Sequence, residues 1–443
     1  MKKPPKGPNP MEVRPLNKQW ARELVSHSSK VYQLKQMVKR AQDGRTHPEI
    51  RPSTIFVVML FFFLFRLCSM EELDRNLKKG RFRKLIPDNE RMPTSHDVVR
   101  QALLKWDLDS HRANHERFIA KFKQNKGPWQ GTIDGWRVAA IDGVEMFCSK
   151  SRCCDECLTR QLKTGETEYF HRAVFAQKVG GDPRIIYETE LLMKKDGSEK
   201  AEGETAASER LIKNMAERYG VLADVWTLDA LYARAPIIHA ALDHHQHVVV
   251  RMKEERRIIM QDAKGLFDSR PPDIAWLEKD KSGNTVTVQA WDEDELTSWR
   301  QVRIPFRMIK MVRTTERTVI VGGNKQQQTD VLERWVGTTM DSGAAGTETV
   351  SRIAAARWDI ENMGFHDLKT YWHMDHPFVH HPTAIEAVLG FLVLAVNLFY
   401  AFLFGHLHHF RQWRIPISEV VEEIKEQVRW QPMLLLPLIW DDS

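Results

Sequence analysis

The sequence has few cysteines, and this scarcity limits the class of protein. Only 5 of the 443 residues are cysteine, and four of these, Cys148, Cys153, Cys154 and Cys157, lie close together. A small secreted domain held by disulfides has paired cysteines that form a framework. The odd and clustered set found here indicates a protein of a reducing compartment.

Long hydrophobic segments are also scarce. Residues 1–10 are basic and contain four prolines in place of the apolar core of a secretory signal. Residues 55–65 are apolar but end at Arg66, and a bilayer span needs about 20 residues. Residues 387–404 are longer, yet a helix that is apolar on all sides can also lie inside a large core. We therefore expect no membrane partner and a protein that stays inside the cell.

Neither charge is in large excess. Lys and Arg number 65 against 59 Asp and Glu, which gives a formal net charge of +6. This balance permits a polyanionic partner without requiring one. Six basic residues fall between positions 75 and 84, where a solvated helix end is an equally good interpretation. The sequence contains no internal repeat and no long low-complexity tract.

Changes in hydrophobic pattern divide the chain. Helical periodicity at 33–42, 55–66 and 98–123 predicts a helical N-terminal region over residues 1–130. Short apolar runs that alternate with helical ones, such as 223–228 after 206–219, predict an α/β core from residue 131 to 253.

A β-rich segment then interrupts this core. Alternating and β-branched runs at 285–290, 302–309 and 317–321 predict a β-rich insertion over residues 254–340. The core resumes over 341–410 with a helix at about 347–371 and the apolar segment 387–404. Residues 411–443 remain as a C-terminal tail.

Two aspartates follow predicted strands. Asp142 comes directly after the apolar residues 138–141, and Asp229 ends the run 224–228. Carboxylates at strand ends can serve a catalytic site, although an acidic residue there is also a common helix cap or turn residue. Asp134 lies in a similar Ile-Asp-Gly segment, but only Asp142 follows an unbroken apolar strand, so we favour Asp142.

Glu361 lies within the helical run 352–370, four residues after Arg357. A plain reading is an ion pair on one helix face, which stabilises a helix by about 0.2–0.5 kcal/mol. The same face carries Phe365 and Leu368, which indicates that the pair lies where the helix meets the core. Asp359 is two residues away and points to another face.

These three segments together resemble the signature blocks of a known family. The blocks are Ala140-Ile141-Asp142-Gly143, Thr227 to Ala233 around Asp229, and Arg357-Trp358-Asp359-Ile360-Glu361 followed by Gly364-Phe365 and Leu368-Lys369. They resemble those of DDE transposases of bacterial insertion sequences, in the branch with a β-rich insertion between the second Asp and the Glu. The resemblance covers about residues 90–410.

The resemblance implies an α/β fold with a ribonuclease-H-like catalytic core. In such a core the first Asp lies on the first strand, the second follows the fourth strand, and the Glu lies on a later helix. It also implies that Asp142, Asp229 and Glu361 bind two Mg²⁺ ions, which Mn²⁺ can replace, because hard ions prefer oxygen ligands. Such a pair of ions supports in-line phosphoryl displacement.

The family resemblance further assigns DNA contacts and partners. It implies that Arg357 and Lys369 contact the DNA end, through charge-assisted bonds to phosphate. The sequence departs from the family in two places. The family has a Tyr three residues before the Arg, and that position is Ala354 here. Lys369 follows Glu361 by eight residues, where seven is commoner. On an α-helix, eight residues leave Lys369 about 80° from the Glu361 face. The partners implied are terminal inverted repeats, bound by the N-terminal region, and target DNA, with a homodimer in the complex and a bacterial cytoplasmic location.

The clustered cysteines offer a separate metal hypothesis. Cys154 and Cys157 form a C-x-x-C pair, and His171 follows fourteen residues later. Thiolates and an imidazole can hold Zn²⁺ tetrahedrally. A single pair does not decide between a zinc site and free buried thiols.

The leading functional hypothesis is a transposase that cleaves element ends and joins the 3′ hydroxyl to target DNA. A decayed or co-opted transposase would bind DNA without cutting it, but all three carboxylates are present. A nuclease that hydrolyses without strand transfer would use the same three residues.

Overall fold

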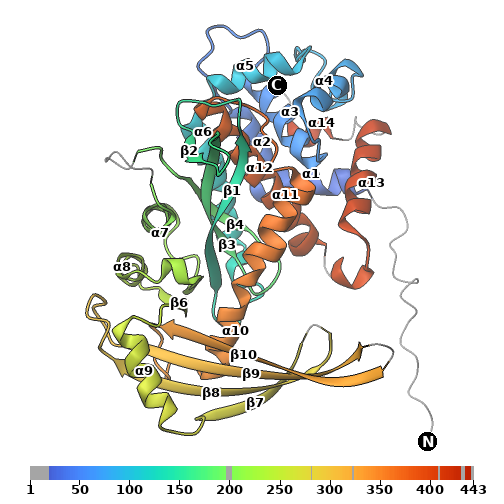
Figure 1. Cartoon of the computed structure of the whole chain (residues 1–443). Helices are drawn as coiled ribbons and strands as arrows, with labels where there is room; N and C mark the ends of the chain where they lie inside the picture. The colour runs from blue at the N-terminus through green and yellow to red at the C-terminus, as the bar shows by residue number, and fades with distance from the viewer. Residues whose placement is uncertain are drawn as a thin grey trace, which may run out of the picture.

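The computed structural model describes residues 19–195, 202–280, 282–321, 324–407, 410–430 and 435–440. A mixed β-sheet runs through these residues, with a helical part at one end and a long β-rich extension at the other (Figure 1). The expectation that residues 1–10 form no secretory signal concerns a segment outside the described residues.

Five strands form the core of the sheet: β1 (Val138–Ser149), β3 (Thr167–Lys178), β4 (Ile186–Leu191), β5 (Val225–Leu228) and β6 (His247–Met252). β1, β3 and β4 are antiparallel neighbours in that order, whereas β5 and β6 lie parallel to β1 on its other side. β2 (Leu158–Gln161) pairs with the start of β3. With β2 set aside, β5 is the fourth strand of the core, so the predicted ribonuclease-H-like α/β fold class is confirmed.

The β-rich segment continues this sheet. It contains α9 (Ile258–Asp268), β7 (Ile274–Lys279), β8 (Thr285–Leu296), β9 (Phe306–Val321) and β10 (Asn324–Thr338). β10 pairs antiparallel with β6 through residues 335–338, so the insertion and the core share one sheet. The strand expected at 302–309 begins only at Phe306, since Pro305 has no backbone N–H for a ladder.

Helices cover both faces of the core sheet. α7 (Glu204–Tyr219) and α8 (Ala235–Asp243) lie on one side of β1 and β3, and α11 (His366–Trp372) lies on the other (Figure 1). α10 (Thr347–Ala356) contacts β5, β6 and β10. A π-helical turn, Ile360–Phe365, leads from α10 into α11 and contacts β1. The expected helix at 347–371 is therefore present, with an irregular turn in its middle.

The N-terminal helices share their core with the C-terminal part of the chain. α3 (Pro52–Leu64), apolar on all sides, packs on α12 (Pro382–Tyr400), and the rings of Phe56 and Phe391 lie 5.3 Å apart. The helix expected at 98–123 is two helices, because the Asp107 carboxylate accepts from the N–H groups that start the second one. The other helices are α1 (Trp20–Tyr32), α2 (Leu34–Lys39), α4 (Met70–Lys78), α5 (His96–Leu104) and α6 (Leu108–Gln124), with 3₁₀ turns at Arg83–Leu85, Gly127–Trp129 and Ala230–Tyr232.

The long apolar segment is a core helix. α12 continues into a second π-helical turn, Ala401–His406, and 89% of its most apolar window is buried within the protein. Its length and composition would suit a membrane span, and it is the one such helix among the described residues. The amide of Asn397 bonds both the N–H and the C=O of Ile186, at 2.9 and 2.8 Å. These bonds explain a polar residue in an otherwise apolar run.

The expected C-terminal tail is instead folded onto the N-terminal helices. A 3₁₀ turn (Phe410–Trp413), α13 (Ile417–Trp430) and α14 (Leu436–Ile439) occupy this part. The buried positions of α13 fall at helical spacing, and the side chain of Gln427 accepts a bond of 2.9 Å from the backbone of Ala21. The assignment of a tail failed because a short amphipathic helix reveals its partner only after folding.

Candidate active site

Asp142 lies on β1, and Asp229 directly follows β5, the parallel neighbour of β1. β1 and β5 pair up to Ile141 and Leu228, so each aspartate directly follows one member of the last pair. Paired strands lie about 4.8 Å apart, and residues at equal positions of parallel strands point to the same face. The fold therefore brings the two carboxylates together, although 87 residues separate them in the sequence.

Glu361 reaches Asp142 from the helix side. Nη1 of Arg357 donates to Oε1 of Glu361 at 2.7 Å and to Oδ2 of Asp142 at 3.2 Å. The oxygens of the two carboxylates thus lie within the combined length of two hydrogen bonds. The Arg357 side chain is 5% exposed, so this contact is more than a surface ion pair between helical neighbours.

Close packing sets the position of the Glu-bearing helix. A Cβ on Gly364 would lie 2.2 Å from Oε1 of Gln177 on β3, so glycine permits the close approach of helix and sheet. The ring of Phe365 packs edge-on against Phe175, with centroids 5.5 Å apart. These contacts give a physical reason for the Gly-Phe pair that follows Glu361.

The π-helical turn changes the position expected for Lys369. The sequence-based angle of about 80° from Glu361 assumed a regular α-helix, and that assumption is wrong. Residues 360–365 are π-helical, and a π turn holds one residue more than an α turn. Eight residues across this turn therefore correspond to seven α-helical ones, which fall about 20° short of two full turns. Lys369 thus returns close to the face of Glu361.

The pKa values of the two aspartates are shifted in opposite directions. Burial raises the pKa of Asp142 to about 7, against the opposing charge of Arg357, and the neighbouring Glu361 adds to the rise. Burial also tends to raise the pKa of Asp229, but a backbone N–H at Ala230 and the charges of Arg357 and Lys253 lower it overall. Carboxyl groups with pKa values shifted apart in one place are typical of functional sites.

The group of carboxylates fits a hard divalent cation. All of its donor atoms are oxygens, which Mg²⁺ prefers. Oδ1 of Asp229 is buried without a hydrogen-bond donor among the described residues, and the Lys253 ammonium is 3.4 Å from it. A buried carboxylate oxygen without a donor is costly unless another partner is supplied, and a cation is such a partner.

A further carboxylate near Asp142 was missed by the sequence analysis. Glu204, at the start of α7, lies against Gly143, where a Cβ would come 2.3 Å from Oε2. The same oxygen accepts from the Tyr232 hydroxyl at 2.9 Å, and Oε1 pairs with Arg172 at 2.6 Å. Gly143 and Tyr232 were visible signals in the two Asp blocks, but the Glu lies far from both in the sequence.

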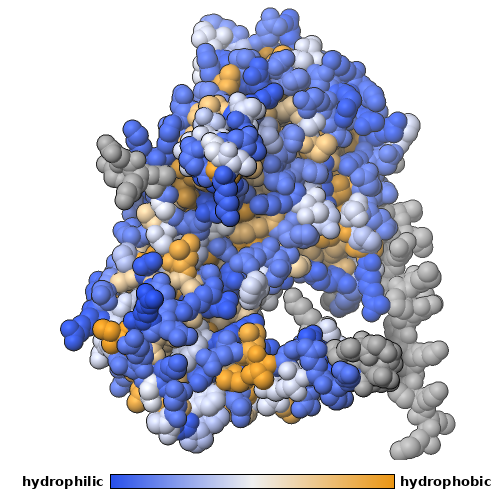
Figure 2. All heavy atoms as spheres, viewed as in Figure 1, coloured by the Kyte–Doolittle hydropathy of each residue, from blue (hydrophilic) through white to orange (hydrophobic). Residues whose placement is uncertain are grey.

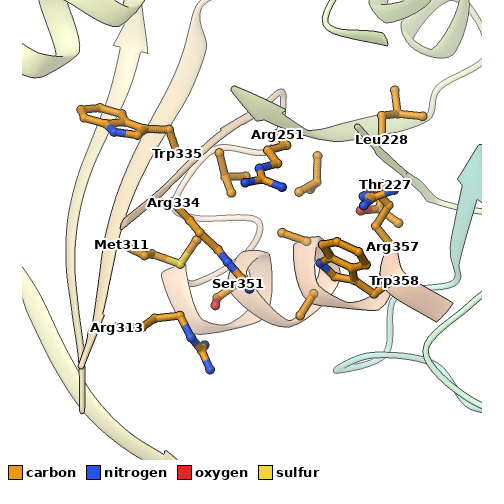
Figure 3. Close-up of a pocket in the computed structure, with 14 residues that line it drawn as sticks. Thr227, Leu228, Arg251, Met311, Arg313, Arg334, Trp335, Ser351, Arg357 and Trp358 are labelled. Carbon is orange, nitrogen blue, oxygen red and sulfur yellow. The ribbon is translucent and has the colours of Figure 1, made fainter. Parts of the chain in front are cut away.

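An arginine-lined pocket adjoins the carboxylates, between the β-rich insertion and α10 (Figure 3). Arg251, Arg313 and Arg334 line it together with Arg357 and Trp358. Burial, and then the charges of Arg313 and Arg251, lower the pKa of Arg334. Within the described part of the chain only Arg313 of these three pairs with a carboxylate, that of Glu278. The pocket therefore holds an excess of positive charge, which the sequence analysis did not predict.

The competing acidic residues have structural partners elsewhere. Asp134 accepts from the Thr349 hydroxyl at 2.7 Å and pairs with Arg352, so it fixes the start of α10. Asp359 accepts from the backbone N–H of Gly180 at 3.1 Å and pairs with Arg184 at 3.5 Å. Asp134 and Asp359 therefore make no contact with Arg357 among these interactions, whereas Asp142 and Glu361 both do.

The predicted cysteine set also comes together. The ligand atoms of Cys154, Cys157 and His171 all lie within 4.8 Å of one another. Cys148 and Cys153 are exposed and outside this group.

Comparison of the chain with models of protein families gives a match over part of its length. A family model described as the transposase DDE domain matches residues 187–398. This segment includes Asp229 and Glu361, whereas Asp142 precedes it on β1. The match over residues 187–398 confirms the resemblance to DDE transposases predicted from the sequence, and a transposase DDE domain supports an enzyme that acts on DNA.

Two further comparisons are less informative. No curated protein matches the sequence. A solved structure, described as a cryo-EM structure of piggyBac transposase synaptic complex with hairpin DNA, is similar over 93% of this chain and 80% of that chain, with 10% identity and a TM-score of 0.45.

Proposed function

We propose that the protein cleaves the ends of a mobile DNA element and transfers the freed 3′ hydroxyl into target DNA. The observation that carries this proposal is the convergence of Asp142, Asp229 and Glu361 around Arg357, from two strands and a helix. Hydrolysis of a phosphodiester and attack by a 3′ hydroxyl are both in-line displacements, so one site can perform both.

We propose that these three carboxylates hold two Mg²⁺ ions, with Mn²⁺ as a substitute. When bound, such ions supply activation of a water or 3′ hydroxyl and stabilisation of the leaving oxygen. Asp142 must lose its proton before it can bind a cation, because burial raises its pKa to about 7. Arg357, which neutralises Asp142 and Glu361 without the metal, is then available to a DNA phosphate.

The DNA end would lie along the arginine-lined pocket. Arg357 and Lys369 contact its phosphates on the helix side, and Arg251, Arg313 and Arg334 extend the positive surface towards β9 and β10. Figure 2 shows the face of the molecule hollowed between the β-rich extension and the body above it. Guanidinium groups suit phosphate because they present several donors in one plane.

The N-terminal region, the number of copies and the location complete the proposal. The N-terminal helical region would bind the terminal repeats, and its basic residues at 75, 78, 79, 81 and 84 are exposed. Since an element has two ends, we propose a homodimer with one copy at each end. The scarcity of paired cysteines suits a bacterial cytoplasm with access to the nucleoid.

The test is cleavage of a duplex that carries the element end, in Mg²⁺, by Asp142→Asn, Asp229→Asn and Glu361→Gln. Each variant should lose cleavage and keep DNA binding. Asp134→Asn and Asp359→Asn are matched controls, because these carboxylates lie nearby in sequence but have structural partners. Retained cleavage in any of the three site variants would remove that residue from the proposed site.

A strand-transfer assay separates a transposase from a nuclease. A labelled end with a free 3′ hydroxyl, incubated with plasmid DNA, should become joined to the plasmid. A protein that only hydrolyses would cut the end and leave the plasmid unlabelled. Inverted repeats in the DNA that flanks the gene are the simplest supporting observation.

A further inference from the structure

Three ligand-type side chains meet at the end of the sheet that carries β2. Cys154 and Cys157 lie in the turn between β1 and β2, and His171 lies on β3. The two sulfur atoms are 3.5 Å apart, and Nε2 of His171 is 3.1 Å from Cys154 Sγ and 3.3 Å from Cys157 Sγ. The three atoms therefore form a small triangle that closes the turn onto the strand.

The backbone prepares this arrangement. The N–H of Cys157 bonds the carbonyl of Cys154 at 3.2 Å, and the N–H of Cys154 lies 3.1 Å from the sulfur of Cys157. His171 is opposite Phe147 in the pairing of β1 with β3, so its ring is fixed by the sheet. Cys157 and His171 are buried, at 5% and 4% exposure, and Cys154 is partly open to solvent.

The triangle has the size of one face of a zinc tetrahedron. Zinc bonds of about 2.3 Å to sulfur and 2.0–2.1 Å to nitrogen, at tetrahedral angles, separate two sulfurs by about 3.8 Å and a sulfur from a nitrogen by about 3.5 Å. The observed separations are a few tenths of an ångström shorter, which small side-chain shifts can supply. A disulfide would need about 2.05 Å between the sulfurs and would not involve the imidazole.

We propose that Cys154, Cys157 and His171 bind one Zn²⁺ ion that fastens the β1–β2 turn to β3. Both thiols release their protons to solvent as the ion binds, and the imidazole binds in its neutral form. The ion is structural and takes no part in the reaction at the carboxylates.

The zinc site is separate from the proposed catalytic site. Residue 147, opposite His171, is five residues along β1 from Asp142, which corresponds to roughly 17 Å of extended strand. The proposal therefore does not depend on the proposed function, and its test uses no cleavage assay.

The test is elemental analysis of the purified full-length protein after exchange into metal-free buffer. We expect about one zinc per chain in the wild type, and loss of most of it in Cys154→Ser, Cys157→Ser and His171→Asn. Cys153→Ser is the matched control, because this exposed neighbour lies outside the triangle and should leave the zinc content unchanged. Zinc in the wild type that persists in all three variants would overturn the assignment.

Cobalt provides a second readout that does not require the variants to be stable. Co²⁺ added to chelator-treated wild-type protein should give thiolate-to-metal absorption in the near ultraviolet, and Zn²⁺ should displace it. Circular dichroism of the same samples reports whether the protein is folded. Folded wild-type protein that binds neither ion, or a disulfide between Cys154 and Cys157 in freshly purified protein, would show that the triangle is not a metal site.

Discussion

Arg357 donates to Oδ2 of Asp142 at 3.2 Å, and this contact joins the Glu-bearing helix to the first strand of the sheet. The guanidinium is nearly fully buried and neutralises a carboxyl whose own burial favours the protonated form. In the metal-free protein, a positive side chain therefore lies where the proposed function requires cations. Charge at this site should consequently depend on pH and on metal.

The first prediction concerns stability and pH in the absence of metal. Asp142 has a pKa of about 7 when folded and an ordinary value of 3.8, so folding favours its neutral form. The stability that the neutral carboxyl of Asp142 contributes is fully present below pH 3.8 and is lost as the pH rises through about 7. Asp142→Asn cannot ionise, so its melting temperature relative to the wild type should increase between pH 5 and pH 8 in EDTA. A difference that stays constant over this range would contradict the raised pKa.

Much of the fold follows from the sequence because strand and helix periodicities are local. The apolar residues before Asp142 and Asp229 read as buried strands, and they are neighbours in the sheet. The β-rich insertion was visible from alternation, since Val286, Val288 and Ala290 face inwards. The pairing of β10 with β6 was not visible, because strand pairing between distant segments leaves no local pattern.

A second prediction tests the close approach of the Glu-bearing helix. Gly364→Ala places a Cβ 2.2 Å from the Gln177 side chain, which should cost about 1–3 kcal/mol of stability and move Glu361. Adding Gln177→Ala should restore part of both stability and cleavage. Gly265→Ala is the matched control, because its Cβ meets nothing within 4 Å inside α9 and should stabilise by about 0.5–1 kcal/mol. Equal effects of the two glycine substitutions in thermal unfolding would contradict the packing argument.

The parts of the site that the sequence did not reveal depend on three-dimensional packing. The π-helical turn at 360–365 has no simple periodicity, so a regular helix was assumed and Lys369 was placed on the wrong face. Glu204 approaches Gly143 from a helix about 60 residues away. The arginine-lined pocket is built from β5, β6, β9, β10 and α10, each of which contributes two or three residues, together with Arg357 and Trp358.

A third prediction follows from the corrected position of Lys369. Because the π turn returns it close to the face of Glu361, Lys369→Ala should weaken binding of the DNA end about tenfold, as expected for loss of one charge-assisted phosphate contact. Thr370→Ala, at the next and exposed position, should bind normally. Fluorescence anisotropy with a labelled end measures both. Unchanged affinity in Lys369→Ala would mean that the lysine does not face the DNA.

A fourth prediction concerns the core helix α12. Asn397→Leu removes the hydrogen-bond partners of the buried N–H and C=O groups of Ile186. The free energy of unfolding should fall by about 2–4 kcal/mol. Asn89→Leu, an exposed asparagine, should change stability by less than about 0.5 kcal/mol. Urea denaturation measures the difference. Wild-type stability in Asn397→Leu would argue that the helix does not pack against β4.

The last prediction separates phosphate binding from simple surface charge. Arg251 and Arg334 have no carboxylate partner within the described residues, and their mutual repulsion should be relieved by a phosphate. Arg251→Gln and Arg334→Gln should each weaken DNA binding and reduce the slope of log affinity against log salt by about one. Arg303→Gln is the control, because Arg303 pairs with Asp243 and lies outside the pocket, so its salt slope should match the wild type. A variant that has lost one phosphate contact releases fewer counterions when it binds DNA, so its salt slope must be smaller. The same slope in all three variants would therefore show that the pocket does not contact the DNA backbone.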